Sequence, residues 1–146
     1  MNQIAFMGVA SGIGANYTGC RYAPVRVKKI ITTETEVDLD WHAVLHPRPG
    51  SSKSAILKEL QERIIRQIAP IVVRGSQFIV IDGDHSSAMG IWQGTMQALH
   101  PNQRFGLVWI DAHPDLHTFS TSRTGHVHGM PLAALLNQGD AELSAI

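Results

Sequence analysis

Residues 105–115 read FGLVWIDAHPD, an apolar run that stops at two aspartates and a histidine. A similar run, FIVI at residues 78–81, stops at DGDHSS, and a helical stretch at Ala88–Leu99 lies between the two. Strands that are apolar throughout and alternate with a helix favour a parallel sheet that is covered on both faces. We therefore predict an α/β fold, in which helices cover both faces of a parallel β-sheet.

Four more segments complete the expected secondary structure. Gln3–Val9 is a short apolar run that stops at a glycine-rich loop, as a buried strand would, and Thr33–Leu39 is expected to form another strand. A helix is expected at Pro24–Ile31, because proline is tolerated in the first turn of a helix. In Lys53–Ile68, apolar residues recur at steps of three and four, which predicts an amphipathic helix.

The composition is that of one ordinary globular domain. The chain has 146 residues, and its 44% hydrophobic content supplies enough apolar material for a buried core. Lys+Arg and Asp+Glu both number 12, and no basic block alternates with aromatic residues, so we expect no nucleic-acid partner. No segment approaches the roughly 18 apolar residues of a membrane span. With its single cysteine, Cys20, the chain is expected to be cytoplasmic and to have no membrane partner.

Ionisable side chains gather just after the two apolar runs. Asp111, His113 and Asp115 follow one run at every second position, and His85 follows the other. In open α/β sheets, ligands bind beyond the carboxyl ends of the strands, so both groups can face one crevice. Residues two apart in an extended segment project to the same side. Any one of these residues could be an ordinary loop acid or a half-buried histidine, but four at two strand ends indicate a metal site.

The donor atoms narrow the choice of metal. No thiolate is near, and mixed imidazole and carboxylate ligands suit Mn²⁺, while Zn²⁺, Fe²⁺ and Co²⁺ are possible but match less well. Asp111 has two carboxylate oxygens and could bridge two ions about 3.5–4 Å apart, which is the spacing typical of two-metal hydrolytic centres. The sequence therefore predicts a metal site that activates water.

Three motifs resemble those of the ureohydrolases, the family that includes arginase and agmatinase. They are GDHS at residues 83–86, DAHPD at 111–115 and TGHVHGMPLA at 124–133. The stretch ASGIGANYTGCRYAP at residues 10–24 is also similar to the glycine-rich N-terminal segment of the arginase branch. The resemblance implies that residues 1–146 are the N-terminal portion of a single ureohydrolase-like domain, a truncated three-layer αβα fold.

The same resemblance implies what such a portion would lack. Chains of this family are about twice as long, and their second half brings a Ser-x-Asp-x-Asp segment that supplies two further metal carboxylates. It also brings a glutamate that helps to hold the substrate. We therefore expect the site in this chain to be incomplete.

Roles for individual residues follow from the resemblance. It assigns His85, Asp111 and Asp115 to one Mn²⁺, and His113 with the bridging Asp111 to a second, so that a complete site holds two ions. His128 is similar to the family's catalytic histidine, which passes a proton to the leaving amine. The implied reaction is hydrolysis of a guanidino or amidino C–N bond with release of urea.

Three further residues are expected to bind the substrate. Thr124 stands where the arginase branch usually has a serine that contacts the amino-acid end of the substrate. His117 and His126 stand where arginases commonly have asparagine. These departures leave the substrate open between arginine, agmatine and another guanidino or formimino compound. The complete form is expected to be a homo-oligomer.

Two interpretations compete with that of a ureohydrolase. A non-catalytic fragment or pseudoenzyme could keep part of the metal site as a binding or assembly module. A continuation of the chain into a Ser-x-Asp-x-Asp segment would favour the enzyme instead. Gly12-Ile-Gly14 after a strand is similar to a dinucleotide-binding fingerprint, but Tyr17 replaces the third glycine and the expected helix begins too late to meet a pyrophosphate.

Overall fold

The computed structural model describes residues 4–34 and 39–144. The strands are β1 (Ala5–Val9), β2 (Asp40–Leu45) and β3 (Phe78–Asp82). The helices are α1 (Ala23–Glu34), α2 (Lys53–Val73), α3 (Ala88–Ala98), α4 (Pro131–Leu135) and α5 (Ala141–Ser144). Three short 3₁₀ turns complete the chain: η1 (Thr18–Tyr22), η2 (His85–Ser87) and η3 (Val127–Gly129). Within the described ranges, no helix combines the length and the apolar character that crossing a membrane requires.

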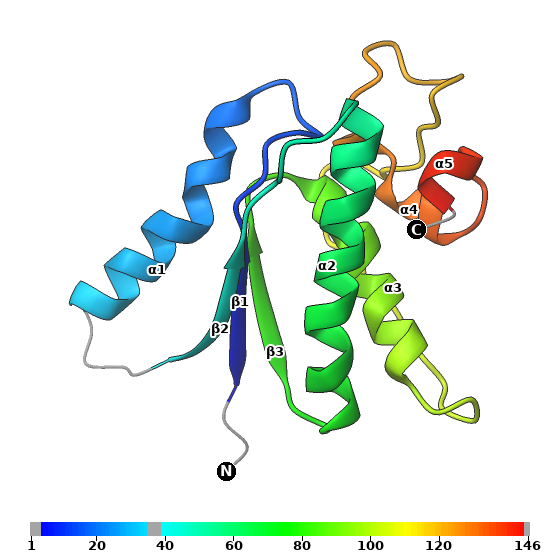
Figure 1. Ribbon diagram of the computed structural model, residues 1–146. Helices are drawn as coiled ribbons and strands as arrows, with labels where there is room; N and C mark the ends of the chain where they lie inside the picture. Colours follow the sequence, from blue (N-terminus) through cyan, green and yellow to red (C-terminus); the bar gives the residue numbers. More distant parts are fainter. Residues whose placement is uncertain (1–3, 35–38, 145–146) are drawn as a thin grey trace.

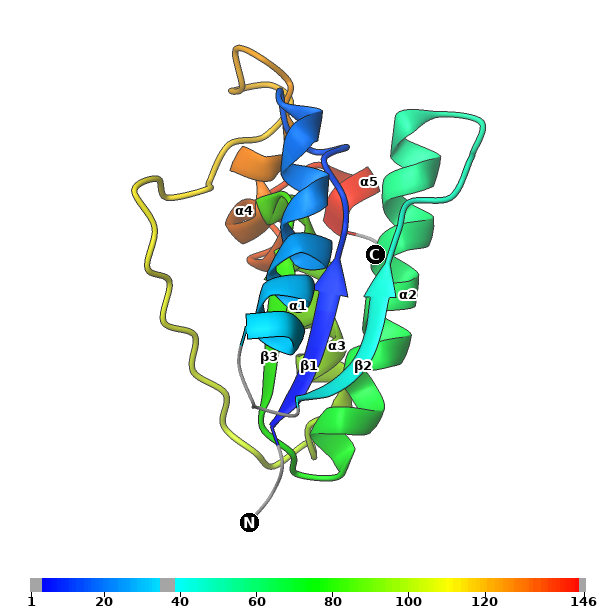
Figure 2. The same ribbon diagram turned by 90° about the vertical axis from the view of Figure 1, so that its left-hand side faces the viewer.

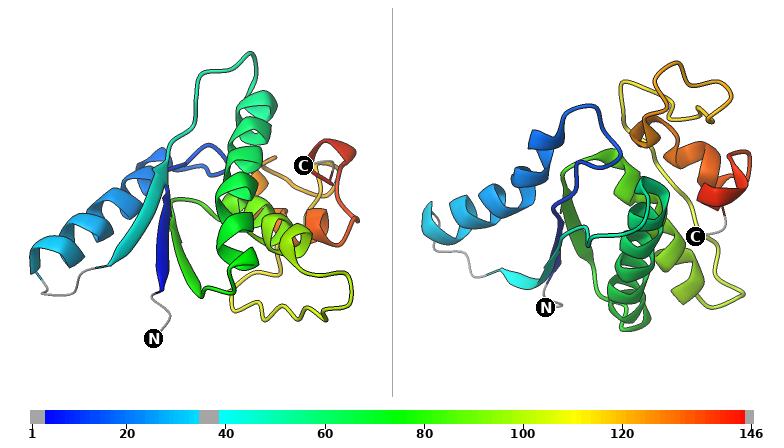
Figure 3. Two further views of the ribbon diagram at one scale, coloured as in Figure 1. Left: turned by 60° about the horizontal axis from the view of Figure 1, so that its bottom comes forward. Right: turned by 45° about the horizontal axis from the view of Figure 1, so that its top comes forward.

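The three strands form one parallel sheet in the order β2-β1-β3. Helix α1 lies on one face of the sheet, and α2 and α3 lie on the other (Figure 1; Figure 3). The central strand β1 is the most buried, with Met7 and Val9 at most 1% exposed. A parallel sheet needs such cover on both faces, because its strands are apolar on both sides. The predicted α/β fold is confirmed.

The main core lies between the sheet and α2. The apolar face of α2 packs on the central strands, and its members are fully buried, as the helical spacing of the apolar residues predicts. This cluster consists of Met7, Val9, Leu45, Leu60, Ile64 and Ile68. A second cluster joins the N-terminal ends of α2 and α3 to the chain after residue 126, and consists of Leu57, Met89, Val127, Met130, Ala134 and Leu143.

Helix α2 begins as predicted and ends later than predicted. Its N-cap is Ser52, whose hydroxyl accepts a hydrogen bond from the backbone N–H of Ala55 at 3.1 Å. The helix continues past Ile68 and through Pro70, and it ends before Gly75, which has a φ of 68°. Glycine adopts this left-handed conformation without strain and so ends the helix.

The strand expected at Thr33–Leu39 is not found in the part of that range that the structure describes. Helix α1 runs on to Glu34, residues 35–38 lie outside the described part of the chain, and the strand is Asp40–Leu45. The observed strand places Ala43 and Leu45 against the main core, whereas the segment TETE has no apolar side chain to bury there. The other expected strands are present as Ala5–Val9 and Phe78–Asp82, and Gln3 lies outside the described residues.

The strand expected at residues 105–110 does not form. This segment is extended but pairs with no strand among residues 4–34 and 39–144, and it passes outside the sheet on the side of β3 (yellow in Figure 2). Val108 is 81% exposed and Ile110 is 93% exposed. An extended segment becomes a strand only when a neighbour accepts and donates its backbone hydrogen bonds. No described segment takes that place, so the prediction that Asp111 follows a strand adjacent to β3 is wrong.

Candidate metal centre

The turn after β3 presents His85 through a network of hydrogen bonds to Asp84. One carboxylate oxygen of Asp84 accepts bonds from the backbone N–H and the hydroxyl of Ser86, at 3.0 and 2.5 Å. The other oxygen accepts bonds from the hydroxyl of Ser11 and the N–H of Gly14, both at 3.2 Å. Asp84 is only 6% exposed, and these four bonds compensate the burial of its charge. Asp84 therefore ties the loop after β1 to the turn that carries His85.

Glycine is required at position 14 by this arrangement. A Cβ atom at Gly14 would lie 2.5 Å from Asp84 Oδ1 and 2.6 Å from Ser86 Oγ. Any side chain there would push the loop away from Asp84. The glycine-rich loop thus serves the turn after β3, and a dinucleotide is not needed to explain it.

Gln61 holds the same turn from the opposite side. It lies on the buried face of α2 and is fully buried. Its amide nitrogen donates to the carbonyl of Ser86 at 3.0 Å, and its amide oxygen accepts from the N–H of Gly90 at 2.8 Å. A buried amide whose nitrogen and oxygen both form hydrogen bonds is held in one orientation. Gln61 therefore fixes the start of α3 and the position of His85, which precedes Ser86.

His85, Asp111 and Asp115 converge on one point. The imidazole Nδ1 of His85 lies 2.7 Å from Asp115 Oδ2 and 3.3 Å from Asp111 Oδ2. One ligand atom from each of the three residues lies within 4.8 Å of the others. The ring of His85 also stacks on Trp109, with the ring centres 4.8 Å apart. The three side chains meet although residues 105–110 form no strand, so the expected convergence holds for these residues.

His113 approaches this group from outside. Its Nδ1 lies 3.5 Å from Asp111 Oδ1, and its side chain is 80% exposed. Asp111 therefore presents one carboxylate oxygen to His85 and the other to His113. Such an arrangement is compatible with a carboxylate that bridges two ions.

The backbone of Asp115 is also constrained. It has a φ of 50°, in the left-handed region that aspartate and asparagine adopt more readily than most residues. Its carbonyl accepts hydrogen bonds from the N–H groups of Leu132 and Ala133, at 3.1 and 3.2 Å. These N–H groups belong to the first turn of α4, where backbone N–H groups have no partner within the helix. Asp115 thus connects the candidate centre to α4.

The two carboxyl groups differ electrostatically. Burial raises the pKa of Asp115, and the neighbouring His85 opposes this rise only in part. The pKa of Asp111 is lowered, chiefly because the backbone N–H of His113 donates to its carboxylate at 2.8 Å, and the charges of His85 and His113 act in the same direction. Asp111 is therefore suited to remain ionised, whereas Asp115 carries a charge that needs compensation.

The three residues fit a divalent cation. Asp115 Oδ2 is buried and has no hydrogen-bond partner, although His85 Nδ1 is 2.7 Å away. Both atoms are of types that bind metal ions, and they lie close enough to share one ion. A buried oxygen without a partner is costly, and a cation at this point would satisfy it. Imidazole and carboxylate donors suit Mn²⁺ or another first-row divalent ion.

A pocket of about 220 Å³ opens beside this group. It collects the residues predicted to bind the substrate together with the predicted catalytic histidine. The predicted residues in its lining are His113, Asp115, His117, Thr124, His126 and His128. Six of the eight predicted site residues thus share one pocket, and the other two, His85 and Asp111, contact Asp115 or His113.

The loop after β1 also holds His128. The backbone N–H of His128 donates to the carbonyl of Gly14 at 3.1 Å, and its ring centre lies 5.9 Å from that of His126. The preceding Gly125 has a φ of 67°, which allows the chain to turn into the pocket. The backbone N–H of His117 donates to the carbonyl of Gly129 at 3.1 Å, and this bond joins two of the segments that line the pocket.

The model of the arginase family matches residues 2–145. The chain belongs to the arginase family. It is 47% identical over its whole length to an arginase of Entamoeba histolytica and 33% identical to an arginase of Bacillus caldovelox. A crystal structure of Entamoeba histolytica arginase in complex with L-ornithine superposes with a TM-score of 0.85 over 99% of this chain, at 26% identity.

This arginase-family chain spans about half the length of the relatives it matches. It covers 44% of the Entamoeba histolytica arginase sequence and 52% of the Bacillus caldovelox sequence. In the superposition it covers 52% of the crystallised Entamoeba histolytica chain. The predicted resemblance to the ureohydrolases is confirmed, and it extends over about half of a family chain.

Two residues that hold the site were missed in the sequence analysis. Asp84 lies inside the motif GDHS, but its spacing gives no sign that both of its oxygens are used to join two loops. Gln61 stands on the apolar face of α2 between Leu60 and Ile64, and a lone polar residue on such a face is a signal that could have marked it. Its partners lie 25 and 29 residues away, so only the fold reveals them.

Asp82 stands at the end of β3 and is half-buried. Its carboxylate accepts a hydrogen bond from the hydroxyl of Ser87, at the start of α3. Burial raises the pKa of Asp82, and the bond from Ser87 only partly opposes this. Asp82 is therefore neither free nor fully exposed.

Asp82→Asn is expected to stabilise the metal-free chain at neutral pH and to lose this advantage in acid. Because the pKa of Asp82 is higher in the folded chain than in the unfolded chain, its protonated carboxyl group favours folding at low pH. That contribution is lost as the pH rises through the folded pKa. Asparagine does not titrate and can still bond to Ser87. Urea unfolding in the presence of EDTA, from about pH 4 to pH 8, measures the difference. A difference that stays constant or shrinks as the pH rises contradicts the prediction.

Proposed function

We propose that residues 1–146 are the N-terminal portion of a ureohydrolase-type enzyme that hydrolyses a guanidino C–N bond and releases urea. The observation that carries the proposal is the convergence of His85, Asp111 and Asp115 beside a pocket lined by His128. Membership of the arginase family supports the same reaction class. The chain spans about half the length of its relatives, so we propose this activity for a longer protein that contains residues 1–146.

The residues of this chain would hold two Mn²⁺ ions unequally. His85, Asp111 and Asp115 would hold one ion, and His113 with the second oxygen of Asp111 would contribute to the other. When bound, the metal pair would stabilise developing negative charge and supply a nucleophile from water at neutral pH. The buried, partnerless oxygen of Asp115 supports this assignment.

His128 would act as the general acid. The nitrogens of a guanidino group are poor leaving groups, so one of them must be protonated as the C–N bond breaks. His128 lines the pocket and is held at its backbone by Gly14, so that its ring is positioned without being tied to the metal group. A histidine is suited to this task because its ordinary pKa lies near neutral pH.

The other lining residues of the pocket would bind the remainder of the substrate. Thr124, His126 and His117 line it, and His117 is oriented by a contact of 3.3 Å between its Nδ1 and the hydroxyl of Thr121. Hydroxyl and imidazole donors suit an oxygen-bearing group such as the carboxylate of arginine. Arginine is therefore preferred over agmatine, which has no carboxylate. The homo-oligomer expected for the complete form stays a prediction.

The isolated chain is expected to bind metal weakly and to show little or no activity. Two Mn²⁺ ions carry four positive charges, whereas Asp111 and Asp115 supply two negative charges and the imidazoles are neutral. The second ion would have only His113 and a shared carboxylate as ligands, and its repulsion from the first would be poorly offset. We expect the second ion to be the first to leave.

Titration of the chain with Mn²⁺ by calorimetry, followed by assays of urea release from arginine and agmatine, tests this expectation. A matched comparison uses a joined protein, in which residues 1–146 replace the corresponding portion of the 47% identical Entamoeba histolytica arginase. The joined protein should bind two ions and release urea. Two tightly bound ions and ordinary turnover in the chain alone would contradict the charge argument. A joined protein that binds Mn²⁺ but releases no urea would instead favour a non-catalytic binding module.

A further inference from the structure

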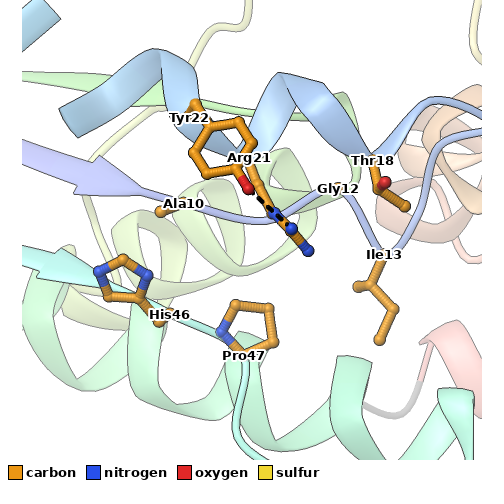
Figure 4. Close-up of a pocket in the computed structure, with 8 residues that line it drawn as sticks. All are labelled: Ala10, Gly12, Ile13, Thr18, Arg21, Tyr22, His46 and Pro47. Atoms are coloured by element: carbon orange, nitrogen blue, oxygen red, sulfur yellow. Dashed lines mark hydrogen bonds between the residues drawn. The ribbon is translucent and has the colours of Figure 1, made fainter. Parts of the chain in front are cut away.

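A second cavity lies outside the candidate metal centre and is larger than the pocket beside it. Its volume is about 530 Å³, within the range of roughly 300–1,000 Å³ that is common for small-molecule sites. Figure 4 shows the residues that line it, which are Ala10, Gly12, Ile13, Thr18, Arg21, Tyr22, His46 and Pro47. No residue assigned above to the metal or the substrate is among them.

The cavity is placed where α/β sheets bind ligands. Its lining follows directly after the carboxyl ends of β1 and β2, which are joined by a bond of 2.7 Å from the N–H of Ala10 to the carbonyl of Leu45. The lining segments are residues 10–22 and 46–47, which follow the neighbouring strands β1 and β2. The candidate metal centre and the pocket beside it draw their side chains from residues 85–129, so the two sites have no lining residue in common.

The lining is cationic and contains no carboxylate. Arg21 donates a hydrogen bond of 2.8 Å to the hydroxyl of Tyr22, and its guanidinium carbon lies 4.9 Å from the centre of that ring. Within residues 4–34 and 39–144, Arg21 has no ion pair, whereas Arg48, Arg63 and Arg66 each pair with a glutamate. Tyr22 orients the guanidinium without neutralising its charge.

The other lining groups suit a ligand with an anionic head and an apolar body. His46 and the hydroxyl of Thr18 add polar groups to the same cavity, and Figure 4 shows His46 and Arg21 among its lining residues. Ala10, Ile13 and Pro47 add apolar surface. Arginine presents a planar fork of donors that matches the oxygens of a carboxylate or a phosphate.

We propose that this cavity binds a small organic anion, with a carboxylate or phosphate group on Arg21 and a short aliphatic body against Ile13 and Pro47. The site is distinct from the one that would bind the guanidino substrate. It shares a loop with that site, because Gly12 and Ile13 precede Gly14, which bonds to Asp84 and to the N–H of His128. A bound anion therefore contacts the loop that supports the metal centre.

Titration of the metal-free chain at low ionic strength, followed by the backbone amide signals in NMR spectra, tests the proposal. Inorganic phosphate and pentanoate are the two probes, which separate a phosphate site from a carboxylate site. We expect saturable shifts at residues 10–22 and 46–47 with at least one probe, and smaller shifts at Gly14 and His128. Arg21→Gln should weaken binding about tenfold or more, since it removes a charge-assisted bond.

Arg74→Gln is the matched control. Arg74 is an exposed arginine at the end of α2, and its replacement removes the same charge at a distance from the cavity. The control should bind both probes as the unchanged chain does. Equal weakening in both variants would mean that only net charge attracts the anions and would overturn the site. Unchanged binding in Arg21→Gln, shifts confined to residues 113–129, or no saturable shift with either probe would also overturn it.

Discussion

Asp115→Asn is expected to abolish measurable Mn²⁺ binding by the chain while the metal-free chain remains folded. Asp115 supplies the buried oxygen that has no hydrogen-bond partner, 2.7 Å from His85 Nδ1. Loss of groups that merely support a metal ligand weakens binding by about 10- to 100-fold, so loss of a charged ligand should cost at least about 100-fold. We measure Mn²⁺ affinity by calorimetry and the stability of the metal-free chain by urea unfolding.

Asparagine is the informative replacement at this position. It matches aspartate in size, and it tolerates the φ of 50° that an alanine would adopt only with strain. The carbonyl of residue 115 would still accept from Leu132 and Ala133. Because burial raises the pKa of Asp115, removal of the charge should not destabilise the metal-free fold at neutral pH. Metal affinity and stability therefore respond differently, which separates a ligand from a structural residue.

Asp40→Asn is the control for this experiment. Asp40 also lies beside an imidazole, with its carboxylate 3.1 Å from His42 Nε2, but this pair stands at the start of β2 and is exposed. Its replacement should leave Mn²⁺ affinity unchanged. If Asp115→Asn keeps the affinity of the original chain, Asp115 is not a metal ligand. If both replacements weaken binding equally, the chain attracts Mn²⁺ only through its overall charge.

His128→Ala in the joined protein is expected to lower kcat by about 100- to 10,000-fold, the range found when a general acid is removed. Bound Mn²⁺ should be nearly unchanged, because His128 lines the pocket but is not one of the three residues that converge. Since its backbone N–H bonds to Gly14, and alanine retains that N–H, the loop after β1 should keep its place. Steady-state urea release gives kcat, and metal analysis gives the Mn²⁺ content.

His100→Ala serves as the control in the joined protein. His100 is an exposed histidine after α3 and lies outside the pocket lining. Its removal should leave kcat and Mn²⁺ content unchanged. Loss of Mn²⁺ in His128→Ala would place that residue among the ligands, and unchanged kcat would show that another group protonates the leaving amine. A fall in kcat/KM with unchanged kcat would indicate a role in binding only.

The sequence alone determined the elements whose pattern is local. The apolar spacing in Lys53–Ile68 predicted α2, and the apolar runs predicted β1 and β3, because periodicity reflects which face each segment buries. The motifs with His85, Asp111 and Asp115 predicted a metal site, because neighbouring carboxylates repel one another unless a cation lies between them. Local pattern and side-chain chemistry are properties that a sequence carries without its fold.

Only the tertiary structure decided how distant segments meet. Residues 105–110 have the apolar character of a strand, yet they form none, because a strand depends on a partner and no described segment supplies one. Asp84 and Gln61 hold the site through bonds to residues 25 to 73 positions away, which no local pattern records. The anion cavity likewise joins Arg21 to His46 across two strand ends. Hydrogen bonds and cavities of this kind depend on distances in space, and those distances are set only when the chain has packed.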